Sequence, residues 1–387
     1  MTEVSVVKKN RMVNLELLRM VSMMLIVVLH YLGKGDLLPV LGDKTLSWGA
    51  YYPWFFEALA IVAVNVYMLL TGFFVASASF KVSRLVKVVL QVWFYAVVVG
   101  AIAGAFGLFP DEGLCIHYIL CLIFPVSMNH YWFMTAYVFM YVLTPFIAAG
   151  ARMLTKRQLQ IVTAALLIIF SVVKSLVPAR LDGDMMGYDS MWYLCICVLA
   201  VYIRQYGIPF VNTVKKGLLV WIVSAGAIFA VTLCLRFVYV QTDLLGTVLN
   251  MCYDYNHVLN LAASLGIFCA FYRMKGPGGR IGKWILKISP YTLGVYLLHE
   301  HLALRYQWQN WLGAEQAKGS SLLIFWVVAA VCAVFTLGIL ADVLRHILFS
   351  GIHKILYFLP PYRKLVAAIQ GIDEQMQERS ERNKSEC

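Results

Sequence analysis

The sequence has few charged residues: Asp, Glu, Lys and Arg together make up 13% of its 387 residues. Soluble domains carry about 25% charged residues, so this inventory cannot cover the surface of a soluble fold. Hydrophobic residues make up 61% of the chain. The composition therefore excludes an ordinary soluble enzyme and predicts a protein embedded in a lipid bilayer.

Pairs of cysteines at the spacing of a metal site are also absent. None of the nine cysteines forms a Cys-x-x-Cys pair, and most lie inside apolar stretches. We therefore expect neither a metal site nor a disulfide framework, and we interpret the cysteines as small apolar side chains. The first apolar stretch is not followed by an Ala-x-Ala-like cleavage site, so we expect an uncleaved anchor there.

Apolar stretches long enough to cross a membrane are abundant. A crossing helix needs roughly 20 predominantly apolar residues. Ten stretches qualify, near residues 13–33, 54–75, 86–109, 130–149, 158–177, 190–205, 217–237, 257–273, 285–304 and 321–345. We therefore predict an all-α, polytopic bundle of about ten transmembrane helices. Residues 110–129 are interrupted by Pro125, and we expect an outer loop with a short helix along the interface.

The basic residues are distributed unevenly. The chain has 32 Lys and Arg against 20 Asp and Glu, a formal charge of +12. Most of the Lys and Arg fall on one side of the ten predicted spans, and the positive-inside rule then places both termini in the cytoplasm. We interpret the charge as a topological signal, and we expect a lipid bilayer rather than nucleic acid as the partner.

Three regions follow from this pattern. Residues 1–345 are expected to form the membrane domain. Residues 346–370 mix apolar and basic side chains, so we expect an amphipathic segment on the inner surface. Residues 371–387 are polar and are expected to form a cytoplasmic tail without fixed structure.

The first predicted span carries three ionisable residues, Glu16, Arg19 and His30. A charged group at mid-helix costs about 2.5–3.5 kcal/mol, so each is a functional candidate. At about 100° per residue, the step from Arg19 to His30 ends about 20° from whole turns, so the two share one stripe. Imidazole can accept a proton near neutral pH, and guanidinium suits phosphate or carboxylate. The simpler interpretation is that Arg19 only pairs with Glu16 and that His30 is an ordinary interfacial residue.

Further polar residues fall toward the outer ends of the predicted spans: Glu57, Asn65, His130, Trp132 and His299. Taken singly, each histidine is more simply a solvated loop residue, and Trp132 belongs to an interfacial aromatic belt. His299 is the better histidine candidate because it follows Val-Tyr-Leu-Leu directly, within the last turns of the predicted span 285–304.

Together these features resemble the acyltransferase-3 family of integral membrane acyltransferases, which modify bacterial surface glycans and related molecules. The resemblance is carried by Glu16-x-x-Arg19 with His30, by Asn65–Phe74, by basic Lys81, Arg84 and Lys87, by His130-Tyr-Trp-Phe, and by Tyr291 to His299. Tyr67 and Thr71 stand where the family commonly has Phe and Ser.

The resemblance implies an O-acyltransferase of the bacterial plasma membrane that transfers groups other than aminoacyl groups. The donor would be cytoplasmic acyl-CoA, with an acetyl, succinyl or other short acyl group and no tightly bound cofactor. The acceptor would be a hydroxyl of an extracytoplasmic glycan or lipid-linked sugar.

The resemblance also implies roles for the candidate residues. Arg19, Lys81 and Arg84 would hold the CoA phosphates. His30 would be the general base or a transient acyl carrier, and Glu16 would orient Arg19. His299 would help to bind or activate the acceptor, which Glu57, Asn65, His130 and Trp132 are candidates to contact.

Two other classes of protein remain open at this stage. A transporter or flippase for lipid-linked sugars also needs many spans and buried polar groups, although such proteins often have paired halves, which this sequence does not display. A non-catalytic scaffold would account for the apolar bulk but gives no reason for an Arg and a His on one stripe.

Overall fold

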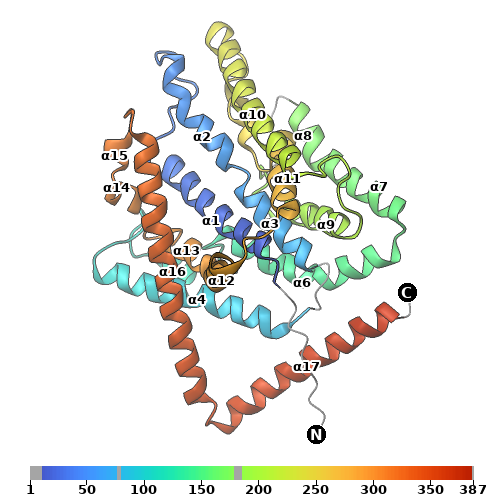
Figure 1. Ribbon diagram of the computed structural model, residues 1–387. Coiled ribbons are helices and arrows are strands. Elements are labelled where there is room, and N and C mark those ends of the chain that lie inside the picture. The colour runs from blue at the N-terminus through green and yellow to red at the C-terminus, as the bar shows by residue number, and fades with distance from the viewer. Residues whose placement is uncertain (1–10, 76–79, 178–184, 386–387) are drawn as a thin grey trace.

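The computed structural model describes residues 11–75, 80–177 and 185–385. Over these residues the protein is built from helices and contains no strand, as the sequence predicts (Figure 1). The first half contains α1 (Val13–Lys34), α2 (Tyr52–Ala60), α3 (Ala63–Val75), α4 (Val82–Ala105), α5 (Ile116–Ile123), α6 (Trp132–Met153), α7 (Lys156–Leu167) and α8 (Val173–Leu176). The second half contains α9 (Ser190–Tyr206), α10 (Val214–Thr242), α11 (Val258–Arg273), α12 (Gly279–Ile288), α13 (Thr292–His299), α14 (Trp308–Trp311), α15 (Ala314–Ala317), α16 (Leu323–Leu356) and α17 (Pro360–Ser385).

Seven helical segments of the described chain are long and apolar enough to cross a membrane. They are Val13–Lys34, Trp48–Phe74, Val82–Ala105, Trp132–Met153, Lys156–Leu176, Val214–Thr242 and Leu323–Leu356. Each coincides with a predicted span. Two further predicted spans coincide with shorter helices, α9 with 17 residues and α11 with 16 residues.

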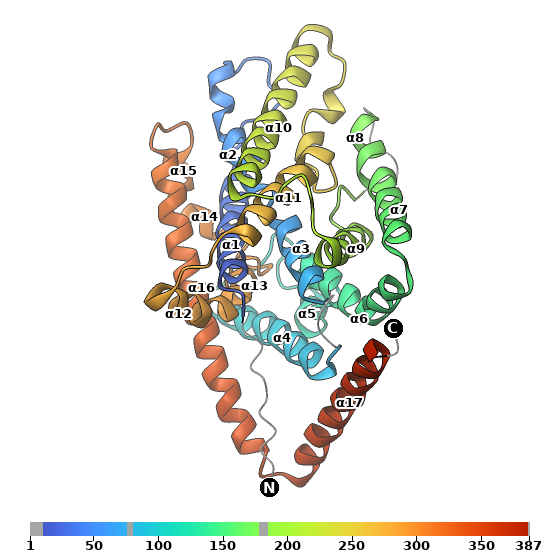
Figure 2. The ribbon, with the colours of Figure 1, turned by 45° about the vertical axis from the view of Figure 1, so that its right-hand side comes forward.

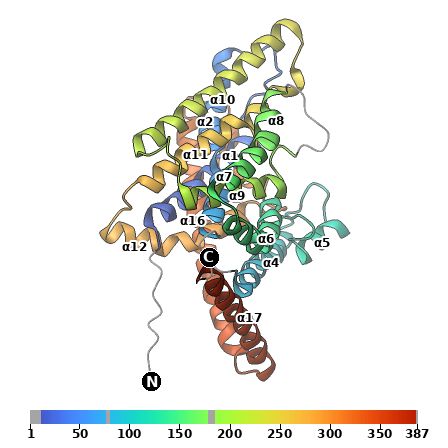
Figure 3. The ribbon, with the colours of Figure 1, turned by 90° about the vertical axis from the view of Figure 1, so that its right-hand side faces the viewer.

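The tenth predicted span, 285–304, is not one continuous helix. Helix α12 ends at Ile288, a 3₁₀ turn contains Pro290, and α13 ends at His299. Proline lacks the amide hydrogen that would continue the preceding helix, and this explains the interruption. Residues 110–129, by contrast, contain the expected short helix, α5, which projects beside α4 and α6 (Figure 3).

The C-terminal region also differs from the prediction. Helix α16 does not stop at residue 345 but continues to Leu356, and α17 begins at Pro360. Residues 371–385, expected to lack fixed structure, are helical in α17. Their Glu, Gln, Arg and Lys residues have high helix propensity, which composition-based reasoning about disorder overlooks. The lower half of α16 projects away from the bundle, and α17 runs back from its end toward α4 (Figure 2).

Helix α17 contacts the bundle through Asp373. The carboxylate of Asp373 accepts hydrogen bonds from the backbone amides of Val82 at 2.6 Å and Ser83 at 3.4 Å. These are the first two residues of α4, whose amides have no partner within the helix. The C-terminal helix therefore caps the helix that begins beside Lys81.

Helices α1 and α3 form the centre of the bundle. The face of α1 packs against α3, α13 and α16, and α3 also packs against α9. The outer helices expose large apolar side chains, among them Phe146, Leu219 and Phe325. Such side chains are stable next to lipid, so the buried core lies at the centre and the apolar exterior is the expected lipid contact.

Helices α10 and α11 approach closely because glycines face each other. A Cβ built on Gly266 would lie 2.6 Å from the backbone nitrogen of Trp221, and one built on Gly217 would lie 2.7 Å from the carbonyl oxygen of Gly266. Small residues at such crossings allow the close backbone approach that packs helices within membranes.

Substitution of Gly266 by alanine should separate these two helices. We expect Gly266→Ala to lower the melting temperature of the purified protein by several degrees, because forced overpacking costs about 1–3 kcal/mol. Gly226→Ala in α10 is the matched control, since a Cβ there meets nothing within 4 Å. Equal melting temperatures for both variants and the parent would contradict this account.

Candidate functional site

The structure brings His30 and His299 together from distant parts of the chain. His30 lies near the end of α1 and His299 is the last residue of α13. Nδ1 of His30 is 2.9 Å from Nε2 of His299, and the ring centroids are 5.1 Å apart. The sequence identified both residues separately, and the fold makes them a hydrogen-bonded pair.

The surroundings of the pair determine its neutral tautomers. Nδ1 of His299 lies 2.6 Å from the carbonyl oxygen of Val295, which can only accept, so this nitrogen carries the proton. Nε2 of His299 is then an acceptor, and Nδ1 of His30 must donate to it. The remaining nitrogen of His30, Nε2, therefore keeps its lone pair.

A carboxylate that the sequence analysis missed completes this centre. Glu300 Oε1 lies 3.3 Å from Nδ1 of His30 and also pairs with the ammonium group of Lys34. Its Oε2 is 3.9 Å from the guanidinium of Arg305. The side chain of Glu300 is only 3% exposed, so its charge is held by partners rather than by water. An acid directly after His299 in an apolar stretch was the available signal.

Backbone contacts fix the surroundings of this carboxylate. Arg305 donates to the carbonyl oxygens of His130 at 2.9 Å and Glu300 at 3.1 Å, and Gln309 donates to that of His30 at 3.2 Å. These bonds join the end of α1 to the segment after α13. The two histidines are consequently held in one orientation.

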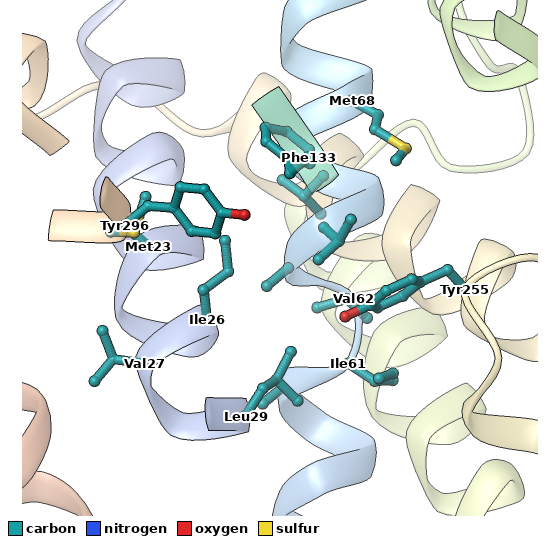
Figure 4. Close-up of a cluster of buried hydrophobic side chains, with 14 of the residues drawn as sticks. Met23, Ile26, Val27, Leu29, Ile61, Val62, Met68, Phe133, Tyr255 and Tyr296 are labelled. Atoms are coloured by element: carbon teal, nitrogen blue, oxygen red, sulfur yellow. The ribbon is translucent and has the colours of Figure 1, made fainter. Parts of the chain in front are cut away.

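His30 and Glu300 line a cavity of about 310 Å³, and His299 lies behind His30. One face of α1 lines it, with Met23, Ile26 and His30 at helical spacing. The facing wall includes Ile61, at the short irregular stretch between α2 and α3. Figure 4 shows apolar side chains of both walls, with the rings of Tyr255 and Tyr296 reaching toward them. Irregular backbone within a membrane is tolerated where it lines a cavity, and the stretch between α2 and α3 lines this one.

Arg19 lies on the same face of α1, one turn before Met23, but it is not part of the cavity wall. Its guanidinium pairs with the carboxylate of Glu16, which also accepts from Arg11 at 3.0 Å. The sequence-predicted contact between Glu16 and Arg19 is therefore present. His30 and Arg19 lie on the same face of α1, and the cavity wall on this face extends from Met23 to His30 without reaching Arg19.

The basic residues at the start of α4 lie toward the same end of α1. The backbone amide and carbonyl of Lys81 each bond to the hydroxyl of Tyr141 at 3.2 Å. The charges of Arg84 and Arg19 both act on the phenol of Tyr137, one turn earlier in α6.

The four remaining sequence candidates divide into two groups. Glu57 and Trp132 line the cavity. Asn65 and His130 lie behind its walls: Asn65 donates to the carbonyl of Tyr255 at 2.8 Å and accepts from Trp192 at 2.9 Å. Nδ1 of His130 is 3.2 Å from the carbonyl of Cys121, and Nε2 accepts from the amide of Leu302 at 3.3 Å. Their polar atoms are occupied by the protein itself.

The central cluster also contains groups of the kind that bind metal ions. One ligand atom each from His30, His299 and Glu300 lies within 4.8 Å of the others. Lys34 and Arg305 already neutralise the carboxylate, however, and both would repel a cation placed there. Among the described residues, this arrangement suits the movement of a proton better than the binding of a metal ion.

Comparison with known proteins gives one match. A family model described as an acyltransferase domain matches residues 12–343. A search of curated proteins and a search of solved structures each found no match. The matched region runs from the start of α1 into α16 and so contains the whole histidine centre.

Removal of the charge of Glu300 should destabilise the protein, because it leaves Lys34 and Arg305 without their buried partner. We expect Glu300→Gln to lower the free energy of unfolding by about 3–5 kcal/mol, measured by thermal unfolding of the purified protein. Asp243→Asn is the control, since it breaks an ion pair with Lys44 in which Asp243 is 75% exposed. That variant should melt like the parent. Similar effects for the two substitutions would show that Glu300 does not hold the centre together.

Proposed function

Since the chain belongs to the acyltransferase-3 family, we propose that this membrane acyltransferase moves a short acyl group, acetyl or succinyl, from cytoplasmic acyl-CoA to a hydroxyl of an extracytoplasmic glycan or lipid-linked sugar. The observation that carries the proposal is the contact of His30 with His299 at the wall of the cavity. It leaves a basic imidazole nitrogen within an otherwise largely apolar membrane core.

The chemistry at His30 follows from its tautomer. As general base, Nε2 takes the proton from the acceptor hydroxyl while that oxygen bonds to the thioester carbonyl carbon. The carbon–sulfur bond then breaks, and the CoA thiolate leaves with the proton from the imidazolium. Nε2 could instead take the acyl group itself and pass it on, and either route uses the same atom.

His299 and Glu300 support this role by position and charge. His299 donates a hydrogen bond to the carbonyl oxygen of Val295 and accepts one from Nδ1 of His30. These two bonds hold the ring of His30 and leave its Nε2 atom free to accept a proton. The Glu300 carboxylate, 3.3 Å from Nδ1 of His30, stabilises the positive charge that forms when the ring takes a proton. Lys34 and Arg305 keep this carboxylate ionised and fixed.

The donor is proposed to bind at the opposite end of the α1 stripe. Arg19, Lys81 and Arg84 would attract the phosphates of CoA, and the eleven residues from Arg19 to His30 span roughly 16 Å along the helix. The pantetheine arm would follow the face that continues through Met23 and Ile26 into the cavity. This layout rests on cytoplasmic termini and on a bacterial plasma membrane, both part of the proposal.

Loss of the imidazole should abolish transfer. In inverted vesicles supplied with radiolabelled acetyl-CoA, we expect His30→Ala to lower incorporation of label into glycan by about 10²–10⁴-fold at matched expression. His353→Ala is the control, because His353 is exposed and bonds only to Tyr362 among the described residues. Near-native transfer by His30→Ala would remove His30 from the mechanism. No transfer by the parent, in vesicles shown to contain acceptor glycan, would favour a transporter.

The donor role of Arg19 can be tested with charge retained. Arg19→Lys keeps a cation but loses the planar guanidinium that binds two oxygens at once. We expect the KM for acetyl-CoA to rise about tenfold, with a smaller change in the KM for the acceptor. Arg157→Lys, an exposed residue of α7, should leave both constants unchanged. Unaltered donor kinetics in Arg19→Lys would contradict a donor-binding role.

A further inference from the structure

The cavity contains a second carboxylate that the proposed chemistry does not use. Glu57 lies in α2, lines the cavity wall and is 9% exposed. Its Oε2 atom has no hydrogen-bond partner. An ionised carboxylate buried without a partner is strongly unfavourable, so such a group either takes up a proton or receives a partner. Because Glu57 lines a cavity, a ligand bound there could supply that partner.

The other carboxylate of the cavity is in the opposite situation. Glu300 is matched by Lys34 and Arg305 and contacts His30. Those cations are therefore engaged at the histidine end of the cavity. Within the described part of the chain, no ion pair neutralises Glu57. Among the described carboxyl groups that line the cavity, Glu57 is therefore the one without a cation of the protein beside it.

Aromatic rings surround that end. Trp132, Tyr188 and Tyr255 all line the cavity and pack on one another, with ring centroids 4.8, 4.5 and 6.1 Å apart. Glu57 lines the same cavity as these rings. These rings come from three separate segments: the start of α6 and the loops before α9 and α11.

The tight loop geometry holds the cluster in place. Gly187 has a φ of +83°, and a Cβ there would lie 2.8 Å from the Cβ of Tyr255 and 2.9 Å from the amide nitrogen of Asn256. Asn65 also binds the carbonyl of Tyr255 at 2.8 Å. Tyr188 and Tyr255 are thus positioned by their backbones rather than by contacts of their hydroxyl groups alone.

We propose that the end of the cavity formed by Glu57, Trp132, Tyr188 and Tyr255 binds an ammonium group carried by the acceptor substrate. A carboxylate beside aromatic rings is the combination that recognises ammonium and quaternary ammonium ions, through charge and cation–π attraction. A cation bound there would stabilise the ionised form of Glu57, whereas a neutral polyol would not. This inference rests on the proposed function, because the acceptor hydroxyl would then face His30 while the cation lies at Glu57.

The acceptor class that follows is a hydroxyl compound that also bears an amine, such as an amino sugar or an amino alcohol substituent on a larger molecule. The binding site has a group for each function of such a molecule: His30 for the hydroxyl and Glu57 for the amine. His30 lies beside a carboxylate that is already paired, whereas the carboxyl group of Glu57 has an oxygen without a partner. A purely anionic acceptor would meet repulsion at Glu57.

A matched pair of probes tests this without identifying the natural acceptor. Choline and 3,3-dimethyl-1-butanol have the same shape and the same hydroxyl, but only choline is charged. Binding of each to the full-length protein in lipid nanodiscs can be measured by calorimetry. We expect the parent to bind choline about tenfold more tightly or better, and Glu57→Gln, which keeps an acceptor oxygen, to lose that preference.

Two further variants make the result decisive. Glu57→Asp keeps the charge and should retain a preference for choline, so a folding defect in Glu57→Gln does not remove the test. Glu315→Gln, an exposed acid in α15, should bind both probes like the parent. The proposal is overturned if the parent does not bind choline at millimolar concentration, binds both probes equally, or keeps its preference in Glu57→Gln.

The binding assay is independent of acyl transfer. If the choline preference depends on Glu57 while no acyl group is transferred from acetyl-CoA, the ammonium site stands and the proposed reaction fails. If transfer to glycan requires His30 while choline does not bind, the reaction stands and the ammonium site fails. The two conclusions are thereby separated.

Discussion

The buried carboxylate of Glu300 is the interaction on which the rest of the centre depends. It joins Lys34 and His30, at the end of the first helix, to Arg305 beyond α13. The attraction between Glu300 and its cations is strong because little water reaches them. For the same reason, loss of one partner would leave a buried charge uncompensated and destabilise the protein. The orientation of His30, its bond to His299 and one wall of the cavity all follow from this junction.

Most of the fold was predictable because the length of an apolar stretch is a local property. The seven long apolar helices of the described chain each fall on a predicted span. The errors arose where local chemistry competes with hydropathy. Pro290 interrupts 285–304, and the charged residues after position 371 favour a helix although they cannot form a core. Hydropathy alone does not distinguish an interrupted helix from a continuous one.

The site was predictable only in part. The α1 stripe gave Glu16, Arg19 and His30, since helical periodicity places residues on a face without any tertiary information. The pairing of His30 with residues near position 300 is set by packing across some 270 positions, and no local pattern encodes it. For the same reason, sequence treats Asn65 and Glu57 alike as polar residues inside a span. The structure separates them: Asn65 is satisfied by its neighbours and Glu57 is not.

The cap that Asp373 places on α4 has a consequence for anion binding at the start of that helix. The start of a helix ordinarily offers unpaired amides to a phosphate, as nucleotide-binding loops do. Here the amides of Val82 and Ser83 are already taken by a carboxylate from the last helix. A polyphosphate that binds near the start of α4 would therefore contact flexible cationic side chains and not these backbone amides. Because the capping carboxylate belongs to α17, the position of the last helix determines whether the amides are available.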